Sequence, residues 1–185
     1  MQGRQQYFAD VVIAGGGVAG TSAAISAARN GLRVILLETR ESLGGLATNG
    51  YVTGVAGMIE GICKEWLQRM KDEGLLVDTP HTPAVDPEKG KLMLEQMALQ
   101  AGARIIYGVT VADCVVENDR IQHIVAYSRS GRMEFHAKYF VDATGDAVLA
   151  AAAGVPCEVG SPEFGGLNMS STLAFRLANV NMAAY

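Results

Sequence analysis

The stretch DVVIAGGGVAGTSAAISAARNGLRVILLE, residues 10–38, decides the fold of this chain. Residues 11–14 are apolar and end at glycine, which predicts a short buried strand. Residues 18–30 are rich in alanine and predict a helix lying close on a sheet, with Gly31 as its left-handed cap. Residues 33–37 predict a second strand. A strand, a glycine turn, a helix and a strand within about thirty residues require parallel pairing and a right-handed crossover.

The turn in this unit has the spacing of a nucleotide-binding site. Gly15, Gly17 and Gly20 fit the pattern GxGxxG, which permits a tight turn, close approach of a pyrophosphate, and close packing of helix on strand. The amides of residues 17–19 open the helix, and their partial positive charge favours a phosphate. Glu38 ends the next strand, where a carboxylate accepts hydrogen bonds from ribose hydroxyls and repels a 2′-phosphate. The unit therefore predicts a dinucleotide site and disfavours NADP, but leaves NAD and FAD open.

The rest of the chain predicts further elements of the same fold class. Along the chain, two segments have helical spacing, one has the composition of an inner strand, and three further runs separated by tight turns indicate an antiparallel meander. The predicted helices are residues 62–73 and 86–101, the inner strand is 103–107, and the meander runs are 109–117, 120–128 and 132–140. After residue 162 the sequence alternates like a new strand.

Two additional glycine segments favour FAD over NAD. LGGLATNG, residues 43–50, follows the second strand, where a nicotinamide dehydrogenase would start another helix. VDATGD, residues 141–146, places a second glycine turn at the carboxyl end of a later strand, where ligands of open α/β sheets bind. A NAD-dependent Rossmann dehydrogenase shares residues 15–38 but explains neither segment.

Composition limits the classes of function. The 185 residues, 49% of them hydrophobic, suffice for one domain with a core, and the net charge of −4 argues against nucleic acid. We find no apolar run long enough for a membrane span and no secretory signal in the first ten residues. Cys63, Cys114 and Cys157 are widely spaced, without a metal-ligand or disulfide pattern. They are consistent with free thiols in a reducing compartment, which predicts a cytoplasmic protein without a metal site.

Together these features resemble the FAD-dependent oxidoreductase family of the glutathione-reductase-like flavoprotein superfamily, related to the flavoproteins of fumarate reductase and succinate dehydrogenase. The resemblance is carried by residues 10–38, 43–50, 86–116 and 139–154. It implies a Rossmann-like three-layer α/β domain over residues 1–160, with a parallel sheet and an inserted antiparallel β-meander. Residues 161–185 would be the truncated start of a substrate or cap domain.

The resemblance also implies which residues hold the cofactor. The pyrophosphate would be held by Gly15, Gly17, Val18, Ala19 and Gly20. The adenosine ribose would be bound by Glu38, flanked by Thr39 and Arg40, and the adenine would meet the backbone of Val111. The segment running past the pyrophosphate and ribityl chain would be Gly44, Gly45, Leu46, Ala47 and Thr48. The turn closing over the cofactor would be Ala143, Thr144, Gly145 and Asp146. For Glu38 and Asp146 a role as a surface cap is the alternative.

Two departures from the family pattern refine these expectations. Covalent-flavin members carry a histidine beside the double glycine, whereas this chain has Ala47, Thr48 and Asn49 there, which predicts noncovalent FAD. Family members also continue beyond Tyr185, so we expect the N-terminal part of an enzyme or one half of a split enzyme. Its partners would be a small-molecule substrate and either a missing C-terminal half or a second copy.

The predicted function is therefore transfer of a hydride between a small organic substrate and noncovalent FAD. No catalytic residue is identified in the sequence. The simplest interpretation of His81 is an exposed loop residue, and that of Arg176 is a salt-bridged residue. The alternatives are the NAD-dependent dehydrogenase and a noncatalytic FAD-binding module.

Overall fold

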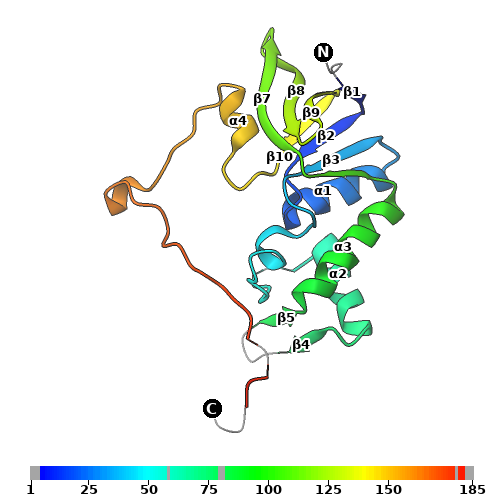
Figure 1. The fold of residues 1–185 in the computed structure, drawn as a ribbon, viewed down its shortest axis with the longest axis vertical. Coiled ribbons are helices and arrows are strands. Elements are labelled where there is room, and N and C mark those ends of the chain that lie inside the picture. Colours follow the sequence, from blue (N-terminus) through cyan, green and yellow to red (C-terminus); the bar gives the residue numbers. More distant parts are fainter. Residues whose placement is uncertain (1–4, 58, 79–81, 178, 182–185) are drawn as a thin grey trace.

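A parallel sheet lies at the centre of the computed structural model, which describes residues 5–57, 59–78, 82–177 and 179–181 (Figure 1). Its strands follow the order β10-β2-β3-β6, and every neighbouring pair is parallel. The bounds are Val11–Ala14 for β2, Val34–Glu38 for β3, Arg104–Tyr107 for β6 and Tyr139–Asp142 for β10. The inner strand β2 is buried at every position, because both faces of the sheet are covered.

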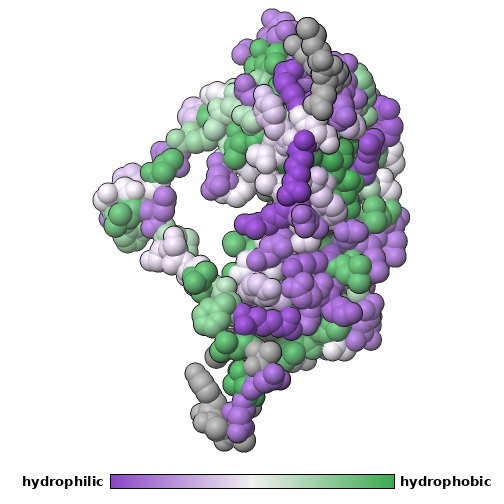
Figure 2. Space-filling model, in the orientation of Figure 1, coloured by the Kyte–Doolittle hydropathy of each residue, from purple (hydrophilic) through white to green (hydrophobic). Residues whose placement is uncertain are grey.

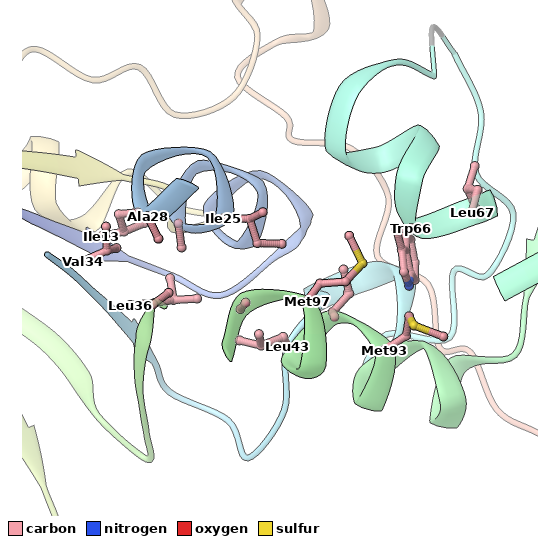
Figure 3. Close-up of a cluster of buried hydrophobic side chains, with 14 of the residues drawn as sticks. Ile13, Ile25, Ala28, Val34, Leu36, Leu43, Trp66, Leu67, Met93 and Met97 are labelled. Atoms are coloured by element: carbon pink, nitrogen blue, oxygen red, sulfur yellow. The ribbon is translucent and has the colours of Figure 1, made fainter. Parts of the chain in front are cut away.

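Helices form the layer on one face of this sheet. The three helices are α1 (Val18–Arg29), α2 (Gly61–Asp72) and α3 (Pro87–Ala101). Asp86 caps α3 as predicted, since its carboxylate accepts the backbone N–H groups of Glu88 and Lys89. Figure 3 shows side chains from the sheet, from all three helices and from the segment after β3 packing into one cluster. Its labelled members are Ile13, Ile25, Ala28, Val34, Leu36, Leu43, Trp66, Leu67, Met93 and Met97.

A second sheet forms the layer on the opposite face. It contains the antiparallel meander, β7 (Thr110–Glu117), β8 (Arg120–Ser128) and β9 (Gly131–His136). The strand β1 (Gln5–Phe8), which we did not predict, pairs in parallel with β9. Apolar side chains of this sheet and of the central sheet share a second buried cluster, which includes Val12, Ile35, Ile124 and Phe135. The predicted three-layer fold, with a parallel sheet and an inserted meander, is thus confirmed.

The predicted extended run of residues 132–140 is wrong in one respect, because it is two strands in two different sheets. The strand β9 ends at His136, and β10 begins at Tyr139. Between them the backbone N–H groups of Lys138 and Tyr139 both donate to the carbonyl of Asp10. This contact with the start of β2 turns the chain from the meander into the central sheet.

The predicted proline-marked loop before α3 also contains more structure than expected. The short strands β4 (Leu76–Asp78) and β5 (Pro83–Val85) pair in antiparallel fashion. Residues 53–55 extend this pairing, because the N–H of Val85 donates to the carbonyl of Thr53 and the N–H of Val55 to that of Pro83. His81 lies outside the described residues.

The last described part of the chain leaves the packed layers. After α4 (Val148–Ala152) and the short 3-10 helix η2 (Pro162–Phe164), the chain runs extended past the body of the molecule to β4 and β5 (Figure 1). Figure 2 shows an opening between this segment and the rest of the protein. Large apolar side chains on it are exposed: Val155, Val159, Phe164, Leu167, Met169, Leu173, Phe175 and Leu177. Residues 168–177 alternate as predicted but form no strand in the described structure.

None of the helices in the described ranges is long and apolar enough to cross a membrane.

Candidate functional site

The glycine turn between β2 and α1 lies at the carboxyl edge of the central sheet. Two of its glycines are required by packing within the chain. Gly15 has φ +97°, and a Cβ on Gly20 would lie 1.9 Å from the carbonyl oxygen of Gly15. Gly17 differs from both, because its φ is −63° and a Cβ built there would meet no atom within 4 Å. The space in front of Gly17 is therefore free for a ligand.

The N-terminus of α1 is open toward this space. Gly17 is the N-cap, and neither a side-chain cap nor an acidic residue in the first turn neutralises the exposed N–H groups. Such a terminus carries partial positive charge and binds anions such as phosphate. Gly17, Val18 and Ala19 all line the adjoining cavity.

Glu38 is held in a defined orientation at the end of β3. One carboxylate oxygen, Oε2, accepts the backbone N–H of Gly16 at 2.6 Å, and Oε1 accepts that of Arg40 at 2.7 Å. Each carboxylate oxygen can accept more than one hydrogen bond, so both retain acceptor capacity. Because Glu38 also lines the cavity, its carboxylate can receive two neighbouring hydroxyl groups of a ligand.

The double glycine brings a third segment to the same place. Residues 45–47 form a 3-10 helix, η1 (Gly45–Ala47), and the N–H of Gly44 before it donates to the carbonyl of Gly16 at 2.8 Å. A Cβ on Gly45 would lie 3.0 Å from the Cα of Gly17, so this approach needs glycine. Behind the loop, the buried hydroxyl of Thr48 donates to the carbonyl of Leu43 at 2.6 Å.

The turn after β10 closes another side of the site. Asp142, the last residue of β10, accepts the N–H and hydroxyl of Thr144 at 2.9 and 2.7 Å and the N–H of Ala150 at 2.8 Å. The Thr144 hydroxyl in turn accepts the N–H of Val148 at 2.9 Å. Burial opposes ionisation of Asp142, but the bonds from Thr144 and Ala150 outweigh it and hold the pKa of this carboxyl below its usual range.

These segments surround one cavity of about 1170 Å³. Every residue that we predicted to contact the cofactor lines this cavity, except Gly20 and Thr48, which lie behind its wall. The cavity is also lined by residues that the sequence analysis did not identify: Leu37, Asn49, Gly50, Val52, Gly54, Val55, Ala56, Cys63, Trp66, Val109, Thr110 and Val148. The glycine spacing of residues 50–57 was the one signal that could have pointed to part of this set.

The charged side chains that line the cavity lie at the end of β3 and in the turn after β10. Arg40 contributes a cation beside Glu38, and Asp146 contributes an anion in the turn after β10. The half-buried Cys63 also lines the cavity, and burial raises the pKa of its thiol. Within the described residues, no group of three or more acidic, histidine or cysteine side chains could hold a metal ion.

The geometry fits the shape of a dinucleotide such as FAD. An open helix terminus suits the pyrophosphate, and a carboxylate at the end of the neighbouring strand suits the ribose. The double-glycine loop and the turn after β10 then provide walls along which the rest of an elongated ligand can extend. No single segment provides all these features, and the fold brings them together.

Comparison with known proteins assigns the chain to a family. A family model described as FAD dependent oxidoreductase matches residues 10–185, so the chain belongs to this family. The predicted resemblance and the predicted cofactor, FAD, are thereby confirmed.

The chain is also similar to curated proteins named thiamine thiazole synthase. The protein from Sulfolobus acidocaldarius is 34% identical over 161 residues, which cover 78% of this chain and 58% of the relative. The protein from Methanococcus vannielii is 31% identical over 145 residues, 74% of this chain and 56% of the relative. The chain thus spans little more than half the length of these relatives.

Solved structures confirm the fold. THI4 from Thermovibrio ammonificans superposes with a TM-score of 0.64 at 28% identity, covering 83% of this chain and 66% of that chain. The myxobacterial chondrochloren halogenase CndH, a FAD-dependent halogenase, superposes with a TM-score of 0.62 over 79% of this chain and 39% of its own. Its identity of 20% shows likeness of fold alone.

Proposed function

We propose that this chain is the FAD-binding part of an oxidoreductase that transfers a hydride between a small organic substrate and noncovalently bound FAD. The observation that carries the proposal is the convergence of four segments, distant in sequence, on one cavity with an open helix N-terminus. Family membership supports the cofactor, and the cavity geometry supports the way in which the chain would hold it.

In this proposal, the backbone at residues 15–19 holds the pyrophosphate, because the N-terminus of α1 at Gly17 has no side-chain cap and lines the cavity. Glu38 accepts hydrogen bonds from the ribose, with Thr39 and Arg40 beside it, and Val111 meets the adenine. The segment of residues 44–48 lies along the ribityl chain, with Thr48 supporting it from behind. The turn of residues 143–146 covers the cofactor from the side of β10.

When bound, FAD supplies the acceptor or donor for the hydride of a substrate C–H bond. The chain contributes binding, orientation and exclusion of water. Ala47, Thr48 and Asn49 beside the double glycine carry no histidine that could link to a flavin, which supports noncovalent binding. The apolar end of the cavity at Val52, Val55, Cys63 and Trp66 would face the reacting end of the cofactor.

The absorption spectrum of the purified protein, with and without added FAD, tests the proposal. Flavin bands that persist through gel filtration are expected, and anaerobic bleaching with a panel of small organic substrates would identify an oxidoreductase. A protein that keeps flavin but shows no bleaching with the panel or turnover with any electron acceptor would instead be the noncatalytic FAD-binding module. Protein that shows no flavin bands after incubation with saturating FAD and gel filtration would contradict the proposal.

A second candidate is thiamine thiazole synthase activity, supported by the 34% identity to the Sulfolobus acidocaldarius protein. Complementation of a strain that requires thiazole for growth would test it. Growth with this chain, and its loss with a Gly17→Val variant, would favour this candidate over a general oxidoreductase. Failure to complement, in a chain shown to bind FAD, would count against it.

We also propose that the exposed segment of residues 167–177 associates with a partner, either a C-terminal half or a second copy. Its apolar side chains are exposed and alternate with polar ones, and an exposed extended segment with this pattern invites association. A Leu173→Lys variant should reduce self-association in light scattering, with Thr172→Lys on the polar face as the matched control. An unsubstituted chain that is monomeric throughout would exclude the second copy.

A cytoplasmic location remains a proposal, supported by the free state of Cys63, Cys114 and Cys157 in the structure. Localisation of a tagged protein in cell fractions would test it.

A further inference from the structure

Gly16 occupies the position that the GxGxxG pattern leaves unspecified, yet its backbone N–H and carbonyl together contact three other segments. Its N–H donates to Glu38 Oε2 at 2.6 Å. Its carbonyl accepts the N–H of Gly44 at 2.8 Å and the buried hydroxyl of Thr21 at 3.0 Å. One residue therefore links the glycine turn to the carboxylate at the end of β3 and to the double-glycine loop.

A side chain at this position would displace those partners. A Cβ on Gly16 would lie 2.8 Å from Glu38 Oε2, 3.0 Å from Glu38 Cβ and 2.7 Å from a terminal methyl of Leu43. The backbone of Gly16 is not in the left-handed region, so alanine would meet no backbone strain there. Because the obstructing atoms belong mainly to the ends of side chains, the fold can survive if Glu38 and Leu43 move.

We propose that Gly16 is a positioning residue for ribose recognition: the absence of a side chain there sets the carboxylate of Glu38 for the ribose hydroxyls. The inference rests on the assignment of Glu38 to the ribose proposed above. Gly16 acts through Glu38, whereas Gly17 acts on the pyrophosphate directly, since a Cβ on Gly17 meets no protein atom. The two adjacent glycines should therefore affect different parts of the ligand.

The experiment compares the binding of ADP and 2′-deoxy-ADP, which represent the adenosine half of FAD with and without one hydroxyl. The unsubstituted chain, Gly16→Ala and Gly17→Ala are each titrated by calorimetry after circular dichroism has established that they are folded. In the unsubstituted chain we expect ADP to bind about tenfold more tightly than 2′-deoxy-ADP, as for a hydrogen bond to a charged group. Gly16→Ala should lose this discrimination. Gly17→Ala should weaken the binding of both ligands and leave the ratio of their affinities unchanged.

The outcomes separate this inference from the proposal on which it rests. If the unsubstituted chain does not distinguish the two ligands, Glu38 does not bind the ribose and both assignments fall. If the unsubstituted chain discriminates and Gly16→Ala discriminates equally, only the role of Gly16 is overturned.

A double-mutant cycle with Glu38→Ala adds a second readout. If Gly16 acts through Glu38, Gly16→Ala should weaken FAD binding roughly 10-fold or more in the unsubstituted chain and have little effect when Glu38 is already alanine. Equal losses in both backgrounds would indicate a general distortion of the turn and would overturn the inference.

Should Gly16→Ala fail to fold, Thr21→Val replaces it, because it removes the bond to the Gly16 carbonyl at similar volume. That variant should reduce the discrimination, and full discrimination in it would overturn the inference.

Discussion

Two helices begin at the same edge of the central sheet, each after a glycine-containing turn, but their N-termini differ. At α1 the N-cap is Gly17, and no side chain satisfies the first N–H groups. At α4 the corresponding groups are occupied, because Val148 donates to the Thr144 hydroxyl and Ala150 to the carboxylate of Asp142. The first terminus is open to a ligand, and the second is closed by the chain itself.

The difference separates two roles that one sequence pattern can have. Both turns line the same cavity, so both contribute to its shape. Only the terminus of α1 retains free N–H donors and an unneutralised partial charge. We infer that phosphate binding belongs to α1, and that the turn after β10 forms a rigid wall. Four predictions, from the largest expected effect to the smallest, test this separation.

The largest effect is expected from Gly17→Val, which fills the free space before α1. The variant should fold, with a loss of stability of about 1 kcal/mol from a poorer N-cap, and should retain no flavin after gel filtration. Urea unfolding and the absorption spectrum measure the two effects. The matched control is Gly20→Ala, which should destabilise the apoprotein by about 1–3 kcal/mol, because its Cβ would overlap the Gly15 carbonyl. A yellow Gly17→Val protein would place the pyrophosphate elsewhere.

The second prediction concerns the carboxylate beside the open terminus. Glu38→Ala should weaken FAD binding by roughly 1.5–3 kcal/mol, the range for hydrogen bonds to a charged group. Isothermal titration of apoprotein measures it. Glu41→Ala is the control, because Glu41 is exposed and does not line the cavity. Equal affinities for the two variants would remove Glu38 from the site.

The third prediction addresses the closed terminus. Asp142→Asn removes the charge that holds Thr144 and Ala150, and should lower the free energy of unfolding by about 0.5–2 kcal/mol, as for loss of a helix cap. FAD affinity should fall less than in Glu38→Ala, because this turn shapes the wall and offers no free terminus. Asp119→Asn, in an exposed hairpin turn, is the control for stability. A loss of affinity equal to that of Gly17→Val would show that the two turns share one role.

The fourth and smallest effect is acid sensitivity. The pKa of Asp142 in the folded protein lies below its ordinary value of 3.8, so its ionised form stabilises the fold. This contribution is fully present above the ordinary pKa and is lost as the pH falls through the folded pKa. The free energy of unfolding, measured with urea at pH 6 and below pH 4, should decrease on acidification in the unsubstituted chain. It should decrease less in Asp142→Asn. An identical pH dependence of the two proteins would contradict this role for Asp142.

The sequence by itself was sufficient for the main helices and strands of the three layers and for the core of the candidate site, although it missed β1, β4 and β5. Apolar periodicity, the glycines at Gly15, Gly17 and Gly20, and the position of Glu38 are local features, set by neighbours a few residues apart. These features predicted β2, α1, β3 and the meander, and they pointed to Gly15, Gly17 and Glu38, which line the cavity. The double glycine and the turn after β10 were also visible in the sequence, and the family resemblance added which residues of these segments would contact the cofactor.

Only the tertiary structure decided which of these groups are free and which are occupied. Asp142 reaches a helix eight residues further along the chain, and Gly16 meets Glu38 across 22 residues and Gly44 in another loop. The same holds for residues 53–55, which complete the pairing of β4 and β5, and for the break between β9 and β10 at Asp10. Local preference settles the conformation of a segment, but the availability of its N–H groups depends on partners that folding brings from elsewhere.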